Sequence, residues 1–211
     1  MEVQLLTHTA NPEKSIIAAF SQCYQKLANI EVVKKHLKHQ SVLEHVSFTF
    51  KIKVSRVCWE QLVRHRIASY TAQSHRYTDV QEQDCAWYIP TEIKKDQVPE
   101  WIEDTKTVYS IYKKWRDKGA TRQTSRYLVN KGVAINAIFT MNLRSLLNFL
   151  TLRLDKHAQE EIKILAARIY QLVMPTMPNL QESFDKIIFS EETPSQDNSI
   201  RALCHGKPDQ T

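Results

Sequence analysis

The sequence predicts a single α+β domain rather than a doubly wound parallel sheet. Residues 46–54 and 133–141 alternate apolar with polar side chains, a period of two that is typical of a strand with one buried face. Other segments carry apolar residues at helical spacing, as residues 142–154 do along a leucine-rich face. With 211 residues, 42% of them apolar, the chain is long enough to bury one sizeable core.

The order of the elements follows from these periodicities and from residues that typically cap helices. Asn11 (before Pro12), Ser55, Thr121 and Asn142 each precede a helical pattern and are expected N-caps. Gly119 is expected to end the longest helix. We expect an edge strand at 1–9, helices after 11 and at 31–38, a loop at 39–45, a strand at 46–54, a helix after 55, a loop at 78–90 with a short strand near 87–89, helices at 98–118 and after 121, a strand at 133–141, and helices at 142–154 and 155–173.

The C-terminal residues differ in composition from the rest of the chain. Residues 191–211 are mostly polar, contain proline and show no apolar periodicity. Such a segment does not bury enough apolar surface to hold one conformation. We therefore expect one domain at 1–190, followed by a flexible tail at 191–211.

Charge and glycine content narrow the class of partner. The formal net charge is +6 and the isoelectric point about 9.1, which favours nucleic acid, nucleotide phosphates or an acidic surface. The chain has only three glycines, at 119, 132 and 206, and this excludes both glycine-rich nucleotide-binding loops. A bound nucleotide must therefore be held by side chains and helix N-termini.

Several other classes of protein are disfavoured by what the sequence lacks. No stretch approaches about 18 uninterrupted apolar residues, so we expect no membrane span, and the N-terminus lacks a signal-peptide pattern. The four cysteines form no CxxC pair and are expected to be free thiols in a reducing cytoplasm. Their spacing and that of the histidines match no zinc pattern, so no metal site is expected.

The basic stretch at residues 64–77 is the first candidate binding segment. It follows a predicted helix, and the helix dipole favours cations at that end, so part of the clustering has a structural cause. A planar guanidinium binds phosphate through two hydrogen bonds, and Ser74 and Arg76 would project on the same side of an extended segment. The charges of Arg64 and Arg66 should lower the pKa of His65, although a buried structural histidine explains this position equally well.

The helix predicted at 142–154 is the second candidate segment. Arg144 and Asn148 are four residues apart and share a face, where they could read a ring rich in carbonyl groups. Arg144 and Arg153 are nine residues apart, which places them about 180° from each other around the helix. They could meet different parts of one long ligand, or the ligand of a neighbouring subunit. Each arginine by itself is also compatible with an ordinary surface charge.

Three separated motifs resemble the family of flavin-dependent thymidylate synthases. Residues 64–74 match its signature, Arg-His-Arg, seven residues and Ser, and here His75, Arg76 and Tyr77 follow. Residues 39–45, HQSVLEH, with Phe48-Thr49-Phe50 after them, are similar to the family's first block, and residues 142–162 to its C-terminal block. Asn11-Pro12-Glu13-Lys14 also stands as in many members. The resemblance runs from about residue 5 to residue 185.

The resemblance implies a fold of the thymidylate synthase-complementing type, α+β with a central, mostly antiparallel sheet flanked by long helices. It implies the reductive methylation of dUMP to dTMP. Methylenetetrahydrofolate would supply the carbon, and FAD reduced by NADPH would supply the hydride. It further implies a cytoplasmic homotetramer whose active sites are shared between subunits, with no nucleic acid or membrane as partner.

The resemblance also assigns residues to roles, motif by motif. Arg153 would be the catalytic residue, facing the pyrimidine and promoting its ionisation, because negative charge on the ring must be stabilised before C5 attacks carbon. The dUMP-binding residues would be Gln61, Arg64, Gln73, Ser74, Arg76, Arg126 and Arg153. The FAD-binding residues would be His39, Ser41, Glu44, Arg64, His65, Arg66, Asn142, Arg144, Asn148 and His157.

One departure from the family pattern concerns the signature itself. Many members have Asn-Glu where this chain has Thr71-Ala72. Ala72 offers no side-chain hydrogen bond, so either Gln73 replaces that contact or only the backbone is used. The sequence therefore leaves the local substrate contact at this position open.

Three other functions are alternatives to the synthesis of dTMP. A nucleic-acid-binding module fits the basic charge and the aromatic residues near the arginines, but no helix-turn-helix, RNA-recognition or zinc-finger pattern is present. A related enzyme could methylate another pyrimidine nucleotide. A purely structural interaction protein would not require three polar motifs in this order.

Overall fold

The computed structural model describes residues 1–85, 87–189 and 198–206, which form two compact units. The first unit comprises residues 1–2, 52–64 and 70–138. The second unit comprises residues 3–51, 65–69 and the described part of 139–211. The strands at 47–55 and 134–142 each begin in one unit and end in the other, so the two units are not successive domains along the chain.

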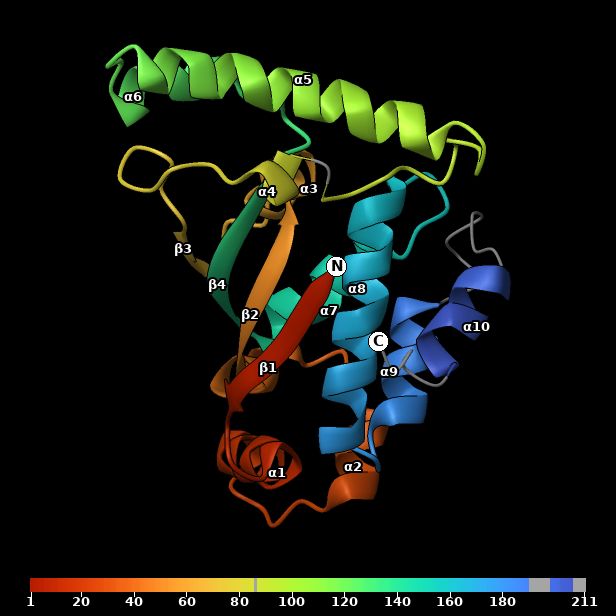
Figure 1. The fold of residues 1–211 in the computed structure, drawn as a ribbon. Coiled ribbons are helices and arrows are strands. Elements are labelled where there is room, and N and C mark those ends of the chain that lie inside the picture. Colours follow the sequence, from red (N-terminus) through yellow and green to blue (C-terminus); the bar gives the residue numbers. More distant parts are fainter. Residues whose placement is uncertain (86, 190–197, 207–211) are drawn as a thin grey trace. The chain divides into compact units, whose positions relative to one another are not determined.

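Four strands form the sheet, in the order β1-β2-β4-β3 (Figure 1). They are β1 (Glu2–His8), β2 (Ser47–Ser55), β3 (Ser69–Ala72) and β4 (Ala134–Asn142). The pairing of β2 with β4 is antiparallel. At one end the Leu143 amide donates to the Val46 carbonyl (2.7 Å), and at the other the Arg56 amide donates to the Val133 carbonyl (2.9 Å). The fold class, the edge strand and the two alternating strands predicted from sequence are therefore confirmed.

The second unit holds most of the aromatic core and the leucine-rich helix. Phe50 on β2 stacks on Phe139 of β4, with ring centroids 5.0 Å apart, and Thr49 and Thr140 share a hydrogen bond on the other face. Helix α7 (Leu143–Arg153) begins where Asn142 Oδ1 accepts from the Ser145 amide, as predicted, and it packs against α8 and α9. The remaining elements of this unit are α1 (Pro12–Tyr24), α2 (Ile30–Lys35), η1 (Gln40–His45), α8 (Glu160–Val173), η3 (Met174–Thr176), α9 (Gln181–Ile188) and α10 (Asn198–His205).

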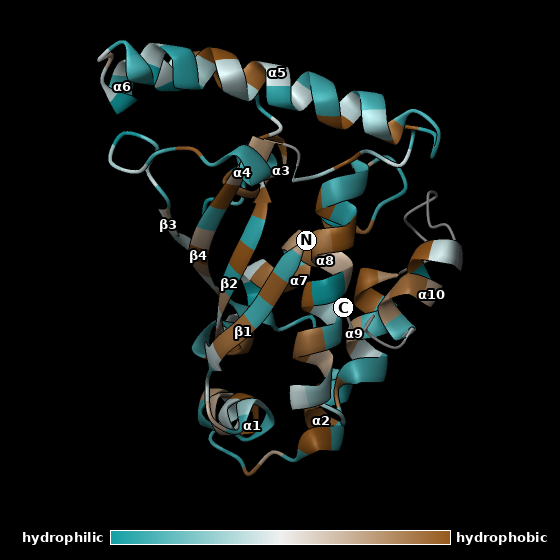
Figure 2. Ribbon diagram, viewed as in Figure 1, coloured by the Kyte–Doolittle hydropathy of each residue, from teal (hydrophilic) through white to brown (hydrophobic). Residues whose placement is uncertain are grey.

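The first unit is built around a long helix. Its helical elements are α3 (Arg56–Leu62), α4 (Glu82–Cys85), α5 (Val98–Asp117), α6 (Arg122–Ser125) and η2 (Arg126–Leu128). Ser55 and Thr121 cap α3 and α6 as predicted, and Gly119, with φ of 89°, follows the end of α5. Hydrophilic and hydrophobic residues alternate along α5 (Figure 2), and its Tyr112 is buried with Val80, Cys85 and Val133.

Three local predictions were wrong. The loop expected at 39–45 is instead the 3₁₀ helix η1 (Gln40–His45). Residues 87–89 form no strand, because Trp87 instead receives the Lys53 ammonium on its ring, 3.9 Å from the centroid. The helix expected from 155 begins only at Glu160, since the Asp155 carboxylate accepts from the His157 amide and holds a turn. Asn11 is the N-cap residue of α1 and Pro12 begins the helix, as predicted, but the Asn11 side chain makes no capping hydrogen bond, because its backbone is left-handed, with φ of 50°.

The prediction of a flexible tail at 191–211 also needs correction in the part that the structure describes. Residues 198–205 form α10, whose Ile200 and Cys204 are buried. The Gln171 side chain on α8 donates to the carbonyls of Leu203 and Gly206, which holds the end of α10. The apolar pair, spaced four residues apart, is too short a pattern to predict a helix from sequence. Residues 190–197 and 207–211 lie outside the described part of the chain.

Candidate functional site

The predicted site residues divide between the two units. Those predicted for the phosphate and ribose of dUMP lie mainly in the first unit, and those predicted for FAD mainly in the second. The first unit holds Gln61, Arg64, Gln73, Ser74, Arg76 and Arg126. The second holds His39, Ser41, Glu44, His65, Arg66, Asn142, Arg144, Asn148, Arg153 and His157.

In the second unit, the predicted catalytic residue Arg153 is held by a histidine of the signature. Arg153 Nε donates to His65 Nε2 at 3.0 Å, and the His65 ring meets Phe149 edge to face. A histidine nitrogen that accepts a hydrogen bond carries no proton, so the ring is neutral. Burial, and after it the charge of Arg153, lowers the pKa of His65 to about 4. His65 therefore remains an acceptor at neutral pH.

This pair partly corrects the sequence-based account of His65. The pKa is lowered as expected, but the main causes are burial and Arg153, not the adjacent Arg64 and Arg66. The two partners are 88 residues apart in the chain. No sequence pattern joins positions at that separation, so the contact could not be found before the fold.

A second pair in the same unit joins two of the predicted FAD-binding residues. Arg144 Nη1 on α7 lies 2.5 Å from Glu44 Oε1 of η1. Both side chains are about half exposed, so they are accessible to a ligand while each orients the other. Asn148, one turn after Arg144, is also exposed, while Leu143, Leu146, Leu147 and Leu150 of the same helix are buried. The predicted common face of Arg144 and Asn148 is therefore a polar, accessible face.

The other predicted residues of the second unit vary in environment. His39 lies beside Tyr24, whose hydroxyl is 3.5 Å from His39 Nδ1. Asn142 uses its side-chain oxygen to cap α7, which leaves its amide nitrogen as a donor. Three further residues, Ser41, Arg66 and His157, are exposed.

In the first unit, Ser74 and Arg76 lie in a tight turn and not on an extended segment. The amides of Tyr77 and Thr78 donate to the Ser74 carbonyl at 2.9 and 3.0 Å, and the Arg76 amide lies 3.3 Å from Ser74 Oγ. The expectation that the two side chains project together at a period of two was therefore wrong. In the turn, the Ser74 hydroxyl faces the backbone N–H of Arg76 and not its guanidinium.

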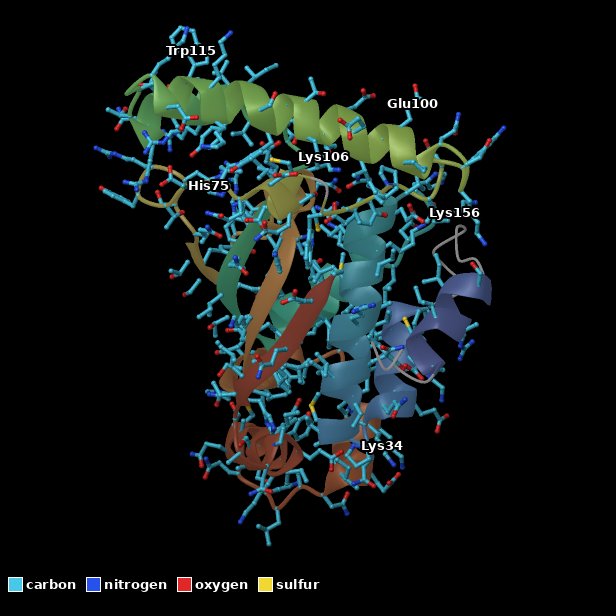
Figure 3. All side chains as sticks on the ribbon, viewed as in Figure 1. Lys34, His75, Glu100, Lys106, Trp115 and Lys156 are labelled. Atoms are coloured by element: carbon cyan, nitrogen blue, oxygen red, sulfur yellow. The ribbon has the colours of Figure 1, made fainter. Side chains whose placement is uncertain are left out.

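The residue between them, His75, is buried, although Ser74 is half-buried and Arg76 is exposed. It is 3% exposed and lies on the loop between β3 and α4 (Figure 3). Burial, the charge of Arg56 and the charge of Arg126 lower its pKa, while Asp84 acts in the opposite direction. Arg126, predicted to bind dUMP, is thus close enough to act on the residue at the centre of the turn. His75 lies within the basic stretch at residues 64–77, but the motif resemblance assigns it no role.

The remaining dUMP-binding candidates flank this turn in sequence. Gln73 uses both ends of its amide within the protein, accepting from Asn136 Nδ2 at 2.9 Å and donating to Thr78 Oγ1 at 3.1 Å. It therefore links the turn to β4. Gln61 is half-buried near the end of α3, and Arg64 just after it is exposed.

The described residues limit what else the chain could do. No group of three or more histidine, cysteine, aspartate or glutamate side chains in them could hold a metal ion. No helix of the described residues is long and apolar enough to cross a membrane. What they do offer is guanidinium, amide and hydroxyl groups, which suit an anionic, carbonyl-bearing ligand.

Comparison with known proteins shows which family the chain resembles over most of its length. The family model described as "Thymidylate synthase complementing protein" matches residues 4–179. The flavin-dependent thymidylate synthase of Pyrococcus furiosus is 36% identical over 191 residues, covering 81% of this chain and 78% of that protein. The enzyme of the same name from Clostridium tetani is 35% identical and covers 85% of each.

The fold is also shared with a solved structure. The crystal structure of Thymidylate Synthase X from Helicobacter pylori, with FAD and dUMP, covers 89% of this chain and 99% of that chain. The TM-score is 0.73 at 21% sequence identity. This likeness is evidence for the fold alone.

Proposed function

The chain belongs to the thymidylate synthase complementing protein family, and on that premise we propose that it is a flavin-dependent thymidylate synthase. It converts dUMP into dTMP by reductive methylation, with FAD as the bound cofactor. The single observation in this chain that carries the mechanism is the fixed catalytic arginine, Arg153, hydrogen-bonded to a neutral His65.

Arg153 is suited to stabilise charge on a pyrimidine. C5 of uracil becomes a nucleophile when negative charge gathers on the ring imide and its carbonyl oxygen. A guanidinium already held in place stabilises this charge without reorganising during the step. Because His65 accepts the Nε–H of Arg153, it sets the orientation of the guanidinium group that would face the ring. A charged His65 would repel Arg153, so its low pKa keeps the pair intact at neutral pH.

The first unit, taken by itself, offers groups that suit the phosphate of a nucleotide. Ser74, Arg76 and Arg126 supply a hydroxyl and two guanidinium groups, and Arg76 and Arg126 are exposed. Guanidinium groups bind a phosphomonoester in a directed, bidentate manner. These side chains would bind the phosphate in place of a glycine-rich loop, which the chain lacks.

The second unit offers the groups that FAD requires. Arg144 and Asn148 present hydrogen-bond donors on one accessible face of α7, and Ser41 adds a hydroxyl. Such donors suit the carbonyl edge of a flavin and the anionic pyrophosphate, and Glu44 holds Arg144 in orientation. When bound, FAD supplies the hydride that completes the methyl group.

Three further features belong to the same proposal. NADPH reduces the flavin, and methylenetetrahydrofolate gives the one-carbon unit. The active enzyme is a cytoplasmic homotetramer whose sites are shared between subunits. The family membership supports these features, and each is open to a direct measurement, the subunit number by sedimentation and the cosubstrates by omission from the assay.

The first experiment is to measure the absorbance of the purified protein. We expect a flavin spectrum that NADPH bleaches under anaerobic conditions, and dTMP as the product when dUMP and methylenetetrahydrofolate are added. A protein that remains colourless and takes up no added FAD would refute the proposed function.

A further inference from the structure

His75 is a buried polar residue that the stability of the fold does not require. Its Nε2 atom is buried and has no hydrogen-bond partner among the described residues. A buried polar atom without a partner destabilises the fold, so an apolar side chain would fill this space at lower cost. A histidine at this position is therefore better explained by the groups around it than by stability.

The residues that follow His75 in the turn are open to solvent. Arg76 and Tyr77 are exposed, Tyr77 to 72%, and the Arg76 guanidinium lies 5.5 Å from the Tyr77 ring. His75 is the buried residue of this turn, and it adds an anchor to the backbone hydrogen bonds and to the side-chain bonds of Gln73 and Thr78. The directions of Ser74 and Arg76 follow from this anchor.

The charged groups around His75 connect the turn to Arg126. Arg56 of α3, Arg126 of η2 and Asp84 of α4 all act on the His75 ring. Asp84 also forms a salt bridge with Lys53 of β2 at 2.9 Å, and Lys53 lies over the Trp87 ring. With its carboxylate shared in this way, Asp84 leaves Arg56 and Arg126 without full compensation. A neutral ring can lie near these cations, whereas a lysine or arginine at this position would repel them.

We propose that His75 is a positioning residue which, as a buried uncharged ring, sets the turn of Ser74 and Arg76 beside Arg126 so that the three groups bind the phosphate of the nucleotide. The inference rests on the proposed function and adds a residue to its substrate site. His75 acts through the three groups and does not touch the ligand.

The test separates a phosphate-specific effect from general loss of structure. The probes are dUMP and deoxyuridine, which differ only in the phosphate, and the protein is the full-length, FAD-loaded enzyme. For His75→Ala we expect dUMP to bind about tenfold or more weakly, while deoxyuridine binding changes less than about twofold. The KM for dUMP should rise by the same factor, and kcat at saturating dUMP should stay nearly unchanged.

The matched control is Val133→Ala, a truncation at another buried position of the first unit. It should leave the ratio of dUMP to deoxyuridine affinity as in the wild type. If His75→Ala does not fold, His75→Gln provides the same comparison with a neutral side chain of similar reach, and a smaller loss in the same direction is expected.

Three results would overturn the inference. His75→Ala, or His75→Gln in its place, could bind dUMP like the wild type, or could lose affinity for both probes equally, as a merely structural residue would. A wild-type enzyme that forms dTMP but does not distinguish dUMP from deoxyuridine would also overturn it, while leaving the proposed function intact. A wild-type protein that binds no dUMP and forms no dTMP would instead refute the proposed function, and the inference with it.

Discussion

The two histidines of the signature segment, His65 and His75, are both uncharged and at least partly buried among other groups. They differ in how they contact these groups. His65, in the second unit, accepts a direct hydrogen bond from Arg153. His75, in the first unit, has a buried nitrogen with no partner among the described residues and acts through burial beneath a turn. In both cases burial is the largest cause of the lowered pKa, and arginines add to it. At both positions, a neutral histidine lies near arginines and adds no further positive charge.

The difference between them predicts different kinds of failure. Losing the hydrogen-bonded partner of Arg153 should impair the chemical step. Losing the buried anchor should impair substrate binding. The variants below test the second unit, first the His65 side of this comparison and then the pair of Glu44 and Arg144, in order of decreasing effect.

Replacement of Arg153 should have the largest effect. We expect Arg153→Ala to retain FAD but to form dTMP about 10²- to 10³-fold more slowly, the usual cost of removing a positioned donor to developing negative charge. The measurement is dTMP formed per flavin at saturating dUMP. Arg201→Ala, which removes an exposed arginine of α10, is the control and should keep the wild-type rate. Full activity in Arg153→Ala would refute the assigned role.

Replacement of His65 should have an intermediate effect on the same step. His65→Leu removes the acceptor for Arg153 Nε, and we expect kcat to fall about tenfold, the equivalent of one hydrogen bond to a charged group. His65→Gln keeps an acceptor oxygen and should lose less. Equal loss in both variants, or a change confined to the KM for dUMP, would contradict the positioning of Arg153 by His65.

Acid should destabilise the fold through His65. Its pKa is about 4 in the folded protein and near 6.5 when unfolded, so between these values the unfolded state binds more protons. The contribution to stability is complete above pH 6.5 and is lost as the pH falls toward 4. Denaturant unfolding of the wild type and of His65→Leu across this range measures the effect. The pH dependence should be weaker in His65→Leu, and identical slopes would contradict it.

The smallest effect is expected at the exposed pair of Glu44 and Arg144. Glu44→Gln keeps a hydrogen-bonding oxygen but removes the charge, and exposed ion pairs contribute little, so unfolding free energy should change by less than about 1 kcal/mol. FAD affinity should change more than stability does, because Arg144 loses its orienting partner. Lys113 and Asp117, an exposed pair on α5, provide the control, since Asp117→Asn should alter neither FAD affinity nor stability noticeably.

The sequence predicted the fold class and the main strands because their signals are local. Alternation along residues 46–54 and the caps at Ser55, Thr121 and Asn142 depend only on neighbouring residues, and all were confirmed. The start of α8 was missed because Asp155 has a good capping side chain but uses it in a turn. Helix α10 was missed because its few apolar residues, with Ile200 and Cys204 the buried pair, stand in a mostly polar segment.

The site was predictable only in part, since its geometry depends on distant contacts. Motif resemblance supplied Arg153, His65, Arg144 and Glu44 as candidates, and the structure brings them together in two pairs. Neither pairing has a sequence signal, because the partners are 88 and 100 residues apart. The turn at Ser74 was misjudged as extended because no glycine or proline marks it. The assignment of each residue to FAD or dUMP remains a prediction.

A single turnover tests the central claim most directly. The FAD-loaded enzyme is reduced with NADPH, freed of excess reductant under anaerobic conditions, and mixed with dUMP and methylenetetrahydrofolate. We predict that the flavin is reoxidised as dTMP forms, one dTMP for each flavin, and that neither change occurs without dUMP. A flavin that stays reduced while no dTMP forms would contradict the account.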